Sequence, residues 1–329
     1  MEPERQTVLV TGACGLLGAH LVALLGRSFR VVGVDRHTWW GDVPATILQG
    51  DLAESAFRSA CLAEVAPDVL IHCAAMVNVD TCEQRPLEAY AANSELTRAL
   101  ARAVPAGCLL AYITTDGIFK GDRAFATEAD LPCPRTVYGR AKLQGEWEVQ
   151  LATANHLIIR TNFYGWSSGR KQTSAEWLYN ALASRAPLTA FDDFFFTPIY
   201  VVDFVERLEI LLRQEHRGLF HLCGRDRVSK YDFVMRMASA ASLPPDHVSR
   251  GSIDEAHLVA PRPKDMSLSS ERFCRVIGVD VPGCEDGLRR FLADRDRPLS
   301  ARTAAPETPA AAWVAGGVAP GDRSGPSRP

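Results

Sequence analysis

The sequence predicts an α/β fold: a doubly wound parallel sheet of the Rossmann type with a smaller C-terminal substrate-binding lobe. Short apolar runs typical of buried strands alternate with stretches of helical periodicity over residues 1–160. Glycines follow the first of these runs, and small or polar residues follow the later ones. Ligands of open α/β sheets bind at the carboxyl ends of the strands, so these residues form the candidate site.

The first strand and helix predict a dinucleotide-binding turn. The apolar run at residues 8–10 precedes three glycines spaced G-x-x-G-x-x-G, and leucines then recur at helical spacing. The first glycine permits a tight turn, the second lets a pyrophosphate approach the backbone, and the third lets helix and strand pack closely. Free N–H groups and the helix dipole favour phosphate at this point. The residues expected to line it are Gly12, Gly15, Leu16, Leu17 and Gly18.

The next two strands lead to residues expected at the adenosine end of the cofactor. The second strand ends in Asp35, whose carboxylate would accept hydrogen bonds from the ribose. An ordinary loop acid is the alternative. Arg36 could instead hold the 2′-phosphate of NADP, so NADPH and NADH are both candidates. The third strand leads to Asp51, which could accept from the adenine amino group, with Leu52 beside it.

Further alternation of strands and helices places small residues at the same edge of the sheet. The fourth strand leads into Cys73, Ala74 and Ala75, which would let the backbone pass close beneath a cofactor. One long helix is expected from residue 83 to residue 103, and it carries Asn93, a further candidate for cofactor binding. The strands expected in this part are residues 8–10, 30–34, 45–49, 69–73, 108–113 and 157–161.

Tyr138 and Lys142 form the most informative pair in the chain. They stand four residues apart, so on a helix they lie one turn apart on the same face. A cation beside a phenol favours the phenolate and lowers its pKa, as a general acid of neutral-pH carbonyl chemistry requires. An exposed tyrosine with a solvated lysine is the alternative reading of such a short motif. The dinucleotide turn upstream favours the catalytic interpretation.

Composition excludes several classes of protein. The 329 residues are 47% hydrophobic and 23% charged, as in a globular chain, and the net charge of −3 gives no footprint for nucleic acid or an anionic membrane. No apolar run approaches the roughly 20 residues of a membrane span. The first strand starts so early that no signal peptide is expected. Nine cysteines without a C-x-x-C predict reduced thiols in the cytoplasm, and eight dispersed histidines predict no metal site.

The predicted organisation has three parts. Residues 1–160 form the dinucleotide-binding core, which includes the helix of Tyr138 and Lys142. Residues 161–297 form mainly the substrate-binding lobe, with some segments returning to the core. Residues 298–329 are rich in proline, alanine and glycine, cannot bury enough surface to offset their ordering entropy, and are expected to be a disordered tail.

Several motifs together resemble a known family. They are T-G-A-C-G-L-L-G at 11–18, I-T-T-D-G-I-F-K-G-D at 113–122, Y-G-R-A-K-L-Q-G-E at 138–146 and R-P-K-D-M-S-L at 262–268. The chain resembles an extended short-chain dehydrogenase/reductase of the nucleotide-sugar branch, and within it most resembles the dTDP-4-dehydrorhamnose reductase group. The likeness covers roughly residues 5–295.

The resemblance implies roles for individual residues. Thr115 would hydrogen-bond the substrate carbonyl, with Thr114 as the competing hydroxyl. Tyr138 would protonate the developing alkoxide, and Lys142 would bind the nicotinamide ribose and, with the cofactor, depress the pKa of Tyr138. For Tyr164 and Trp166 aromatic packing is the alternative role, and for Arg262 a structural salt bridge. The residues expected to contact the substrate are Met76, Asp116, Asn162, Tyr164, Trp166 and Arg262.

The resemblance also implies a reaction. Asp116 is followed by Gly117 where the related dehydratases have a glutamate, so dehydration is not expected. The implied activity is NAD(P)H-dependent reduction of a 4-keto-6-deoxy nucleotide sugar, dTDP-linked, by a homodimer. Gly117 also replaces the tyrosine usual in the reductases, which leaves the sugar open. An NAD-dependent epimerase and a non-catalytic dinucleotide-binding subunit, like the regulatory subunit of methionine adenosyltransferase, are the alternatives.

Overall fold

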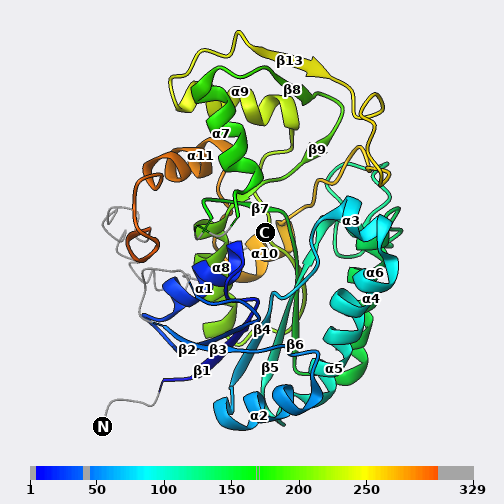
Figure 1. Ribbon diagram of the computed structural model, residues 1–329, viewed down its shortest axis with the longest axis vertical. Coiled ribbons are helices and arrows are strands. Elements are labelled where there is room, and N and C mark those ends of the chain that lie inside the picture. Colours follow the sequence, from blue (N-terminus) through cyan, green and yellow to red (C-terminus); the bar gives the residue numbers. More distant parts are fainter. Residues whose placement is uncertain (1–4, 40–44, 168, 170, 303–329) are drawn as a thin grey trace, which may run out of the picture.

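A seven-stranded parallel sheet forms the centre of the molecule (Figure 1). The computed structural model describes residues 5–39, 45–167, 169 and 171–302. The strand order is β11-β6-β5-β4-β1-β2-β3, and every neighbouring pair runs parallel. This confirms the predicted doubly wound parallel sheet. Its strands are β1 (Thr7–Thr11), β2 (Arg30–Asp35), β3 (Thr46–Gln49), β4 (Val69–His72), β5 (Leu109–Thr115), β6 (His156–Thr161) and β11 (Gly218–His221).

Helices cover both faces of this sheet because successive strand residues point to opposite sides. Val8 and Val10 of β1 pack with α1 (Leu16–Leu25) and α8 (Val201–Arg213) in one core. Leu9, between them, packs with α2 (Ser55–Val65), α5 (Leu96–Ala103) and α6 (Val137–Ala152) in the other. The chain thus buries both faces, and the order of strands reverses between β1 and β4, where ligands of such sheets bind.

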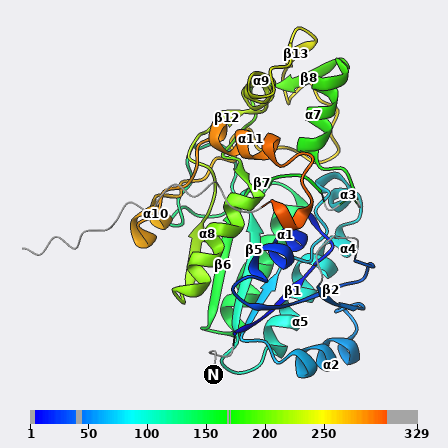
Figure 2. The same cartoon turned by 90° about the vertical axis from the view of Figure 1, so that its left-hand side faces the viewer.

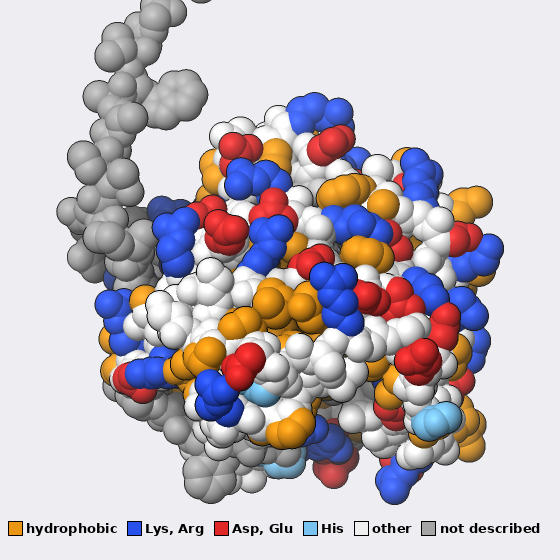
Figure 3. Space-filling view, turned by 90° about the horizontal axis from the view of Figure 1, so that it is seen from above, with side chains coloured by type: hydrophobic (Ala, Val, Ile, Leu, Met, Phe, Trp, Pro, Cys, Tyr) orange, Lys and Arg blue, Asp and Glu red, His pale blue; other side chains and the backbone are white. Residues whose placement is uncertain are grey.

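The remaining elements form a smaller lobe beyond the carboxyl ends of the strands (Figures 1 and 2). Three two-stranded pairs, β7 with β10, β9 with β12 and β8 with β13, are combined with helices. Seen from above, basic and acidic side chains are interspersed over this face (Figure 3). The elements are β7 (Phe163–Tyr164), α7 (Ser174–Ser184), β8 (Leu188–Phe191), β9 (Phe195–Phe196), β10 (Ile199–Tyr200), β12 (Val228–Ser229), α9 (Lys230–Ala240), β13 (Val248–Gly251) and α11 (Cys284–Ala293). The helix α10 (Glu271–Ile277) instead packs against β11 at the edge of the central sheet.

The helix predicted over 83–103 is present from Pro86 onward, but it is not one regular α-helix and does not begin at residue 83. The structure has α3 (Val79–Gln84), then α4 (Pro86–Tyr90), a π-helical turn at Ala91–Glu95, and α5. Proline has no N–H to give to a preceding carbonyl, so it is tolerated at the start of a helix and not inside one, and α4 begins at Pro86. The π turn has no signal in the apolar spacing.

The packed part of the chain extends beyond the predicted boundary at residue 297. A 3₁₀ turn at Leu299–Ala301 follows, and the side chain of Leu299 is buried in the core that contains α1. Arg302 donates to the carbonyl oxygens of Trp166 and Arg297 at 3.4 and 3.1 Å. The tail prediction is therefore wrong for residues 298–302, and residues 303–329 lie outside the described residues. In the described part of the chain, no helix combines the length and the hydropathy needed to cross a membrane.

Candidate active site

The glycine turn after β1 is pressed against the loop that follows β4. Gly12 has a φ of +69°, and a Cβ there would lie 2.8 Å from the backbone nitrogen of Ala74. A Cβ on Gly18 would lie 2.1 Å from the carbonyl oxygen of Gly12. Gly15 precedes α1, and within the described chain no side chain caps its first N–H groups. An uncapped helix start at the switch point fits the diphosphate of a dinucleotide.

The residues predicted at the phosphate and adenosine ends differ in exposure. Leu16 is half-buried at the helix start, whereas Leu17 is buried in the core below it. Asp35 lies at the end of β2 and accepts from the backbone N–H groups of Cys14 at 3.0 Å and His37 at 2.9 Å. It thereby ties the glycine turn to β2, and each of its oxygens keeps one lone pair for a ribose hydroxyl.

Arg36 and Asp51 lie side by side at the mouth of the adenosine region. Their side chains are 3.7 Å apart, and that of Arg36 is 69% exposed. Asp51 also accepts from the N–H of Ala53 at 2.9 Å. Leu52 is buried in the core that contains α2, so only its backbone could face a cofactor. A surface ion pair of this length restrains the Arg36 guanidinium only weakly, so the guanidinium is available to a 2′-phosphate.

The loop after β4 is fixed by polar contacts from below. The Thr11 hydroxyl accepts from the N–H groups of Cys73 and Ala74, both at 3.2 Å, and is 2.7 Å from Nδ1 of His72. Burial lowers the pKa of His72 to about 3, so it is a neutral core histidine. The backbone of the half-buried residues Cys73, Ala74 and Ala75 is thus held in place at the carboxyl end of β4.

Asn93 supports this loop from the π turn. Its side chain is buried, accepts from the N–H of Met76 at 2.8 Å and donates to the Met76 carbonyl at 3.0 Å. The Asn93 carboxamide therefore holds the loop in place, and a contact of Asn93 with the cofactor stays a prediction. Met76 packs against a small cluster that includes Val137 and Tyr138, so the loop and α6 meet at this point.

Tyr138 and Lys142 lie on the first turns of α6, directly above the carboxyl end of β5. The helix is capped by the Thr136 hydroxyl, which accepts from the N–H of Gly139 at 3.0 Å. Lys142 is buried, and its Nζ donates to the Ile113 carbonyl at 2.8 Å. The same Nζ is 4.1 Å from the centroid of the Tyr112 ring. The predicted pair is thus on one helix, with the lysine anchored to the sheet.

The electrostatics of the pair differ from the prediction. Burial raises the pKa of Tyr138, and the Asp116 charge raises it further, against a smaller opposing effect from a hydrogen bond with Thr115. Burial also lowers the pKa of Lys142, to about 7. Lys142 does not lower the pKa of Tyr138 in this structure, because the ammonium is itself desolvated and directed to a carbonyl. The effect that the resemblance implies for Lys142 together with a bound cofactor stays a prediction.

Thr115, Asp116 and Asn162 form a hydrogen-bonded group beside Tyr138. The Thr115 hydroxyl donates to Oδ1 of Asp116 at 2.9 Å and accepts from the N–H of Gly117 at 3.0 Å. The Asn162 amide donates to Oδ2 of Asp116 at 2.6 Å. Burial raises the pKa of Asp116 to about 6, despite these bonds. The competing hydroxyl of Thr114 is buried and has no partner in the described chain, so Thr115 is the threonine that faces this group.

Sequence reasoning missed Lys230, the first residue of α9. Its Nζ lies 3.3 Å from the centroid of the Phe196 ring and 5.3 Å from that of Phe194. Burial lowers the pKa of Lys230 to about 8, and the charge of Asp116 raises it in part. Only the fold brings these two residues together, since α9 and β5 are far apart in the sequence. The run of three phenylalanines at 194–196 was the one available signal that this loop is buried.

Tyr164 and Trp166 pack in the lobe and do not border the site. The Trp166 ring stacks on Phe291 with centroids 4.2 Å apart, and its N–H donates to the Phe291 carbonyl at 2.5 Å. The Tyr164 ring meets those of Tyr200, Phe233 and Phe291. The expectation of sugar contacts is corrected in favour of aromatic packing, because both rings are buried.

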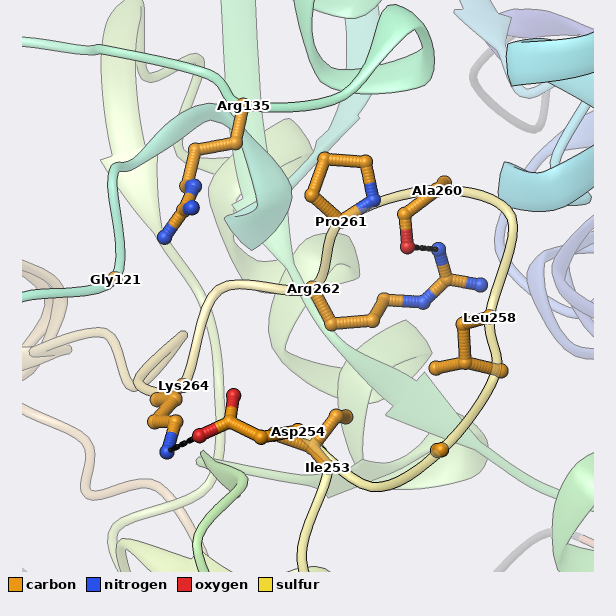
Figure 4. A pocket seen from close by; sticks show the side chains of 10 residues that line it. Gly121, Arg135, Ile253, Asp254, Leu258, Ala260, Pro261, Arg262 and Lys264 are labelled. Carbon is orange, nitrogen blue, oxygen red and sulfur yellow. Dashed lines mark hydrogen bonds and ion pairs between the residues drawn. The ribbon is translucent and has the colours of Figure 1, made fainter.

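Arg262 lines a separate cavity of about 330 Å³ between the loop at 253–264 and the segment before α6 (Figure 4). It donates to Asp80 at 2.9 Å and to the Ala260 carbonyl at 3.1 Å, so the salt-bridge alternative is present. Lys264 pairs with Asp254 across the same loop, and Arg135 belongs to the opposite wall. The cavity is basic enough for an anion, but Arg262 has a carboxylate partner already.

The fold and the Tyr138–Lys142 pair beside a glycine turn define a dinucleotide-dependent enzyme of the short-chain dehydrogenase/reductase type. The chain belongs to the RmlD substrate binding domain family, whose profile matches residues 6–297. It is 30% identical to a dTDP-4-dehydrorhamnose reductase of Sinorhizobium fredii over 256 residues, 74% of this chain and 85% of the relative. The resemblance stated from the sequence motifs is thereby confirmed.

Two further similarities bear on function. The crystal structure of the Bacillus anthracis dTDP-4-dehydrorhamnose reductase in complex with NADP has a TM-score of 0.79 and 27% identity, covering 88% of this chain and 99% of that one. The methionine adenosyltransferase 2 subunit beta of Rattus norvegicus is 28% identical over 306 residues, 89% of this chain and 90% of the relative. The chain is therefore similar both to proteins named as reductases and to proteins named as a subunit of another enzyme.

Proposed function

We propose that this protein reduces a 4-keto-6-deoxy nucleotide sugar, dTDP-linked, with NADPH or NADH. The observation that carries the proposal is the convergence of Thr115, Tyr138 and Lys142 at the carboxyl end of β5, next to the uncapped start of α1. The curated relative from Sinorhizobium fredii, named as such a reductase, supports this choice of substrate class.

The dinucleotide would be held by the glycine turn, by Asp35 or Arg36 at its adenosine end, and by the loop at 73–75. Bound there, it supplies the hydride. Lys142 would bind the nicotinamide ribose, and its partner in the structure is a single backbone carbonyl. An ammonium has three hydrogens, so two more donors remain for ribose hydroxyls.

Tyr138 would donate its proton to the oxygen of the reduced carbonyl. The phenol is protonated at neutral pH, as a general acid must be, and the bound cofactor together with Lys142 would have to lower its raised pKa for the proton to leave readily. Thr115 would hold the same oxygen through its hydroxyl, and Asp116 and Asn162 would contact the sugar beside it. Met76 would contribute to the wall of the same site, where it packs near Tyr138. In this proposal Arg262 keeps its ion pair with Asp80 and takes the diphosphate only if that pair opens.

The proposed setting is a homodimer in the cytoplasm. The exposed residues Trp147 and Leu151 on α6 provide apolar surface for a second copy. No disulfide joins the nine cysteines, all of which belong to the part of the chain that the structure describes, as a reducing compartment requires. Size-exclusion chromatography with light scattering tests the dimer directly.

A non-catalytic binding subunit is the second candidate, since the rat relative is named as a subunit of methionine adenosyltransferase. The two candidates differ in turnover. A reductase consumes one NAD(P)H per sugar, whereas a binding subunit binds the dinucleotide and consumes none. An epimerase, the further alternative from the sequence, would change the sugar without net consumption of cofactor.

The experiment follows NAD(P)H absorbance at 340 nm with a dTDP-linked 4-keto-6-deoxyhexose. We expect turnover by the parent and a fall of about 10²–10⁴ in kcat for Tyr138→Phe, with cofactor affinity kept. Tyr90→Phe is the matched control, because Tyr90 packs in the same cluster and should leave the rate unchanged. Lys142→Met should lower both kcat and cofactor affinity. Cofactor binding without turnover in the parent would establish the binding subunit instead.

A further inference from the structure

The Thr11 hydroxyl holds the start of the loop that follows β4. Thr11 ends β1 directly before Gly12, and it is the register partner of His72, the last residue of β4. Its Oγ1 accepts from the N–H groups of Cys73 and Ala74, both at 3.2 Å, and lies 2.7 Å from Nδ1 of His72. Thr11 and His72 are 0% and 1% exposed, so their polar atoms depend on one another rather than on solvent.

The number of donors and acceptors fixes the direction of the bond between Thr11 and His72. A hydroxyl has one hydrogen and two lone pairs. The two backbone N–H groups occupy both lone pairs, so the Thr11 hydrogen has to be donated, and in the described chain its one acceptor is Nδ1 of His72. Nδ1 is then the unprotonated nitrogen of a neutral imidazole. The opposite tautomer would direct a third donor at Oγ1 and leave the Thr11 hydrogen buried without an acceptor, which is unfavourable.

The second ring nitrogen of His72 continues this chain of hydrogen bonds. Because Nδ1 is unprotonated, Nε2 has the ring hydrogen, and it lies 3.1 Å from the Thr97 hydroxyl. That hydroxyl donates its own hydrogen to the carbonyl oxygen of Asn93 at 3.0 Å. The Asn93 carboxamide binds both backbone polar groups of Met76. The chain from Thr11 to Asn93 therefore contacts the loop at 73–76 at both of its ends, and each hydrogen in the chain has an acceptor.

The loop at 73–76 is the backbone that the dinucleotide of the proposed function would pass over. The Cys73 N–H has a second acceptor in the Thr11 carbonyl at 3.3 Å, whereas the Ala74 N–H has none in the described chain and depends on the hydroxyl. We propose that His72 is a positioning residue for the cofactor: it accepts the Thr11 hydrogen at Nδ1, which keeps the lone pairs of that hydroxyl directed at the Cys73 and Ala74 N–H groups and so fixes the loop beneath the dinucleotide. This inference rests on the proposed function, which supplies the ligand of the loop.

The test uses two substitutions that each keep one half of the bonding of His72. An Asn side chain places its amide oxygen as many bonds from Cβ as Nδ1, so His72→Asn keeps the acceptor for Thr11 and loses the donor to Thr97. A Gln side chain places its amide as many bonds from Cβ as Nε2, so His72→Gln keeps the donor and loses the acceptor. Fluorescence titrations give the Kd of NADPH and of NADH. We expect His72→Gln to bind its cofactor at least about tenfold more weakly than the parent, and His72→Asn to stay within about threefold, as for the loss of one buried hydrogen bond.

A second measurement needs no cofactor. Amide hydrogen exchange in the free protein reports how firmly the Ala74 N–H is held by the Thr11 hydroxyl. We expect this amide to exchange faster in His72→Gln than in the parent, and at close to the parental rate in His72→Asn. Both variants lose the imidazole, so a role of His72 in core packing alone would lower the melting temperature of both and would not separate their exchange rates or their affinities.

The outcomes separate this inference from the proposed function. If the parent binds a dinucleotide and the two variants bind it equally well, the role of His72 is wrong while the reductase stands. If the parent binds neither NADPH nor NADH, the proposed function fails, and the exchange rate of the Ala74 amide in the two variants decides the role of His72 by itself. If neither variant folds, NMR of the parent with labelled histidine ring nitrogens replaces them. We expect the Nε2–H tautomer of His72 at neutral pH, and the Nδ1–H tautomer would overturn the inference.

Discussion

The hydroxyl of Thr115 donates its hydrogen bond to the carboxylate of Asp116, 2.9 Å away. A hydroxyl has a single hydrogen, so Thr115 cannot donate to a substrate carbonyl while it donates to Asp116. The hydrogen must turn from one to the other when substrate binds. Protonation of Asp116 makes this easier, because a carboxylic acid can donate to the threonine oxygen in return. The protonation state of Asp116 therefore governs which way Thr115 points.

Asp116 should make stability depend on pH. Its pKa is raised from 3.8 to about 6, so the folded state binds more protons than the unfolded state between these values. The free energy of unfolding is therefore unaffected by Asp116 below pH 4, where the carboxyl is protonated in both states. It falls as the pH rises through 6, because the folded state must then bury the ionised carboxylate. At 1.36 kcal/mol per pKa unit the loss is about 3 kcal/mol. Asp116→Asn cannot ionise and so avoids this loss. In urea unfolding, the free energy of unfolding of the variant should equal that of the parent at pH 4 and exceed it at pH 7.5.

The control for this prediction is Asp122→Asn. Asp122 is exposed and paired with Lys120, which lowers its pKa, so its contribution has the opposite sign. This second variant should gain no stability at pH 7.5 relative to pH 4. An Asp116→Asn curve parallel to that of the parent across the range would mean that Asp116 is not desolvated as the structure indicates.

Gly139 and Gly117 should respond differently to alanine. A Cβ on Gly139 would lie 2.3 Å from the carbonyl oxygen of Gly117, whereas a Cβ on Gly117 would meet Thr115 Oγ1 at 3.4 Å, an ordinary contact. Gly139→Ala should destabilise the protein by about 1–3 kcal/mol, since the start of α6 must shift. Gly117→Ala should change stability by less than about 1 kcal/mol. Thermal unfolding of both variants measures the difference, and equal losses would contradict the close approach.

Asp35 should limit the use of NADPH. In the proposed cofactor site its carboxylate would face a 2′-phosphate, and repulsion between the two negative charges would be worth about 1 kcal/mol or more near a surface. Asp35→Asn keeps an oxygen for the Cys14 N–H and removes the charge. The affinity for NADPH relative to NADH should then rise about tenfold in fluorescence titrations. Arg36→Ala should shift the same ratio the other way, and a ratio unchanged in both variants would leave Asp35 a loop acid.

Residues 298–302 should matter for folding although they were expected to belong to the tail. Leu299 is buried against the core of α1, and Arg302 binds two backbone carbonyls. Truncation after residue 297 should therefore lower the melting temperature by several degrees, because burying a leucine contributes about 1.5–3 kcal/mol. Truncation after residue 302 serves as the control and keeps both contacts. Equal melting temperatures would show that the 3₁₀ turn adds nothing.

The sheet and the glycine turn could be predicted because their signals are local. Each strand is a short apolar run, and Gly18 is required by its close approach to Gly12 within the turn. Gly12 could be predicted from the spacing of the glycines, although the contact that requires it is with Ala74 after β4. The Tyr138–Lys142 pair could be placed on one helix by spacing alone. Spacing does not say where a long side chain points, and Lys142 points to Ile113 on β5, which is why it does not lower the pKa of Tyr138 in this structure.

The residues that the sequence could not place depend on tertiary contacts. The pairing of β12 with β9 positions the start of α9 and so places the Lys230 ammonium over the Phe196 ring. No sequence pattern near Lys230 indicates this contact. Trp166 follows the last strand before the lobe, and at this position the sequence does not distinguish an aromatic residue that contacts the substrate from one that packs in the core. The stack on Phe291 settles its role, and Phe291 lies in a helix far along the chain.

The π turn at Ala91–Glu95 has a consequence beyond the shape of its helix. A turn widened by one residue releases a carbonyl from the helical ladder. The carbonyl oxygen of Asn93, within this turn, accepts from the Thr97 hydroxyl at 3.0 Å and from the Tyr112 hydroxyl at 3.2 Å, and the Tyr112 ring centroid lies 4.1 Å from the Lys142 Nζ. The π turn thus supplies a hydrogen-bond acceptor for the tyrosine whose ring contacts the buried lysine. Deleting one residue of this turn would restore a regular α-helix and move the Asn93 carbonyl away from the Tyr112 hydroxyl. The Tyr112 ring would then be free to shift, and the pKa of Lys142, which contacts that ring, would change with it.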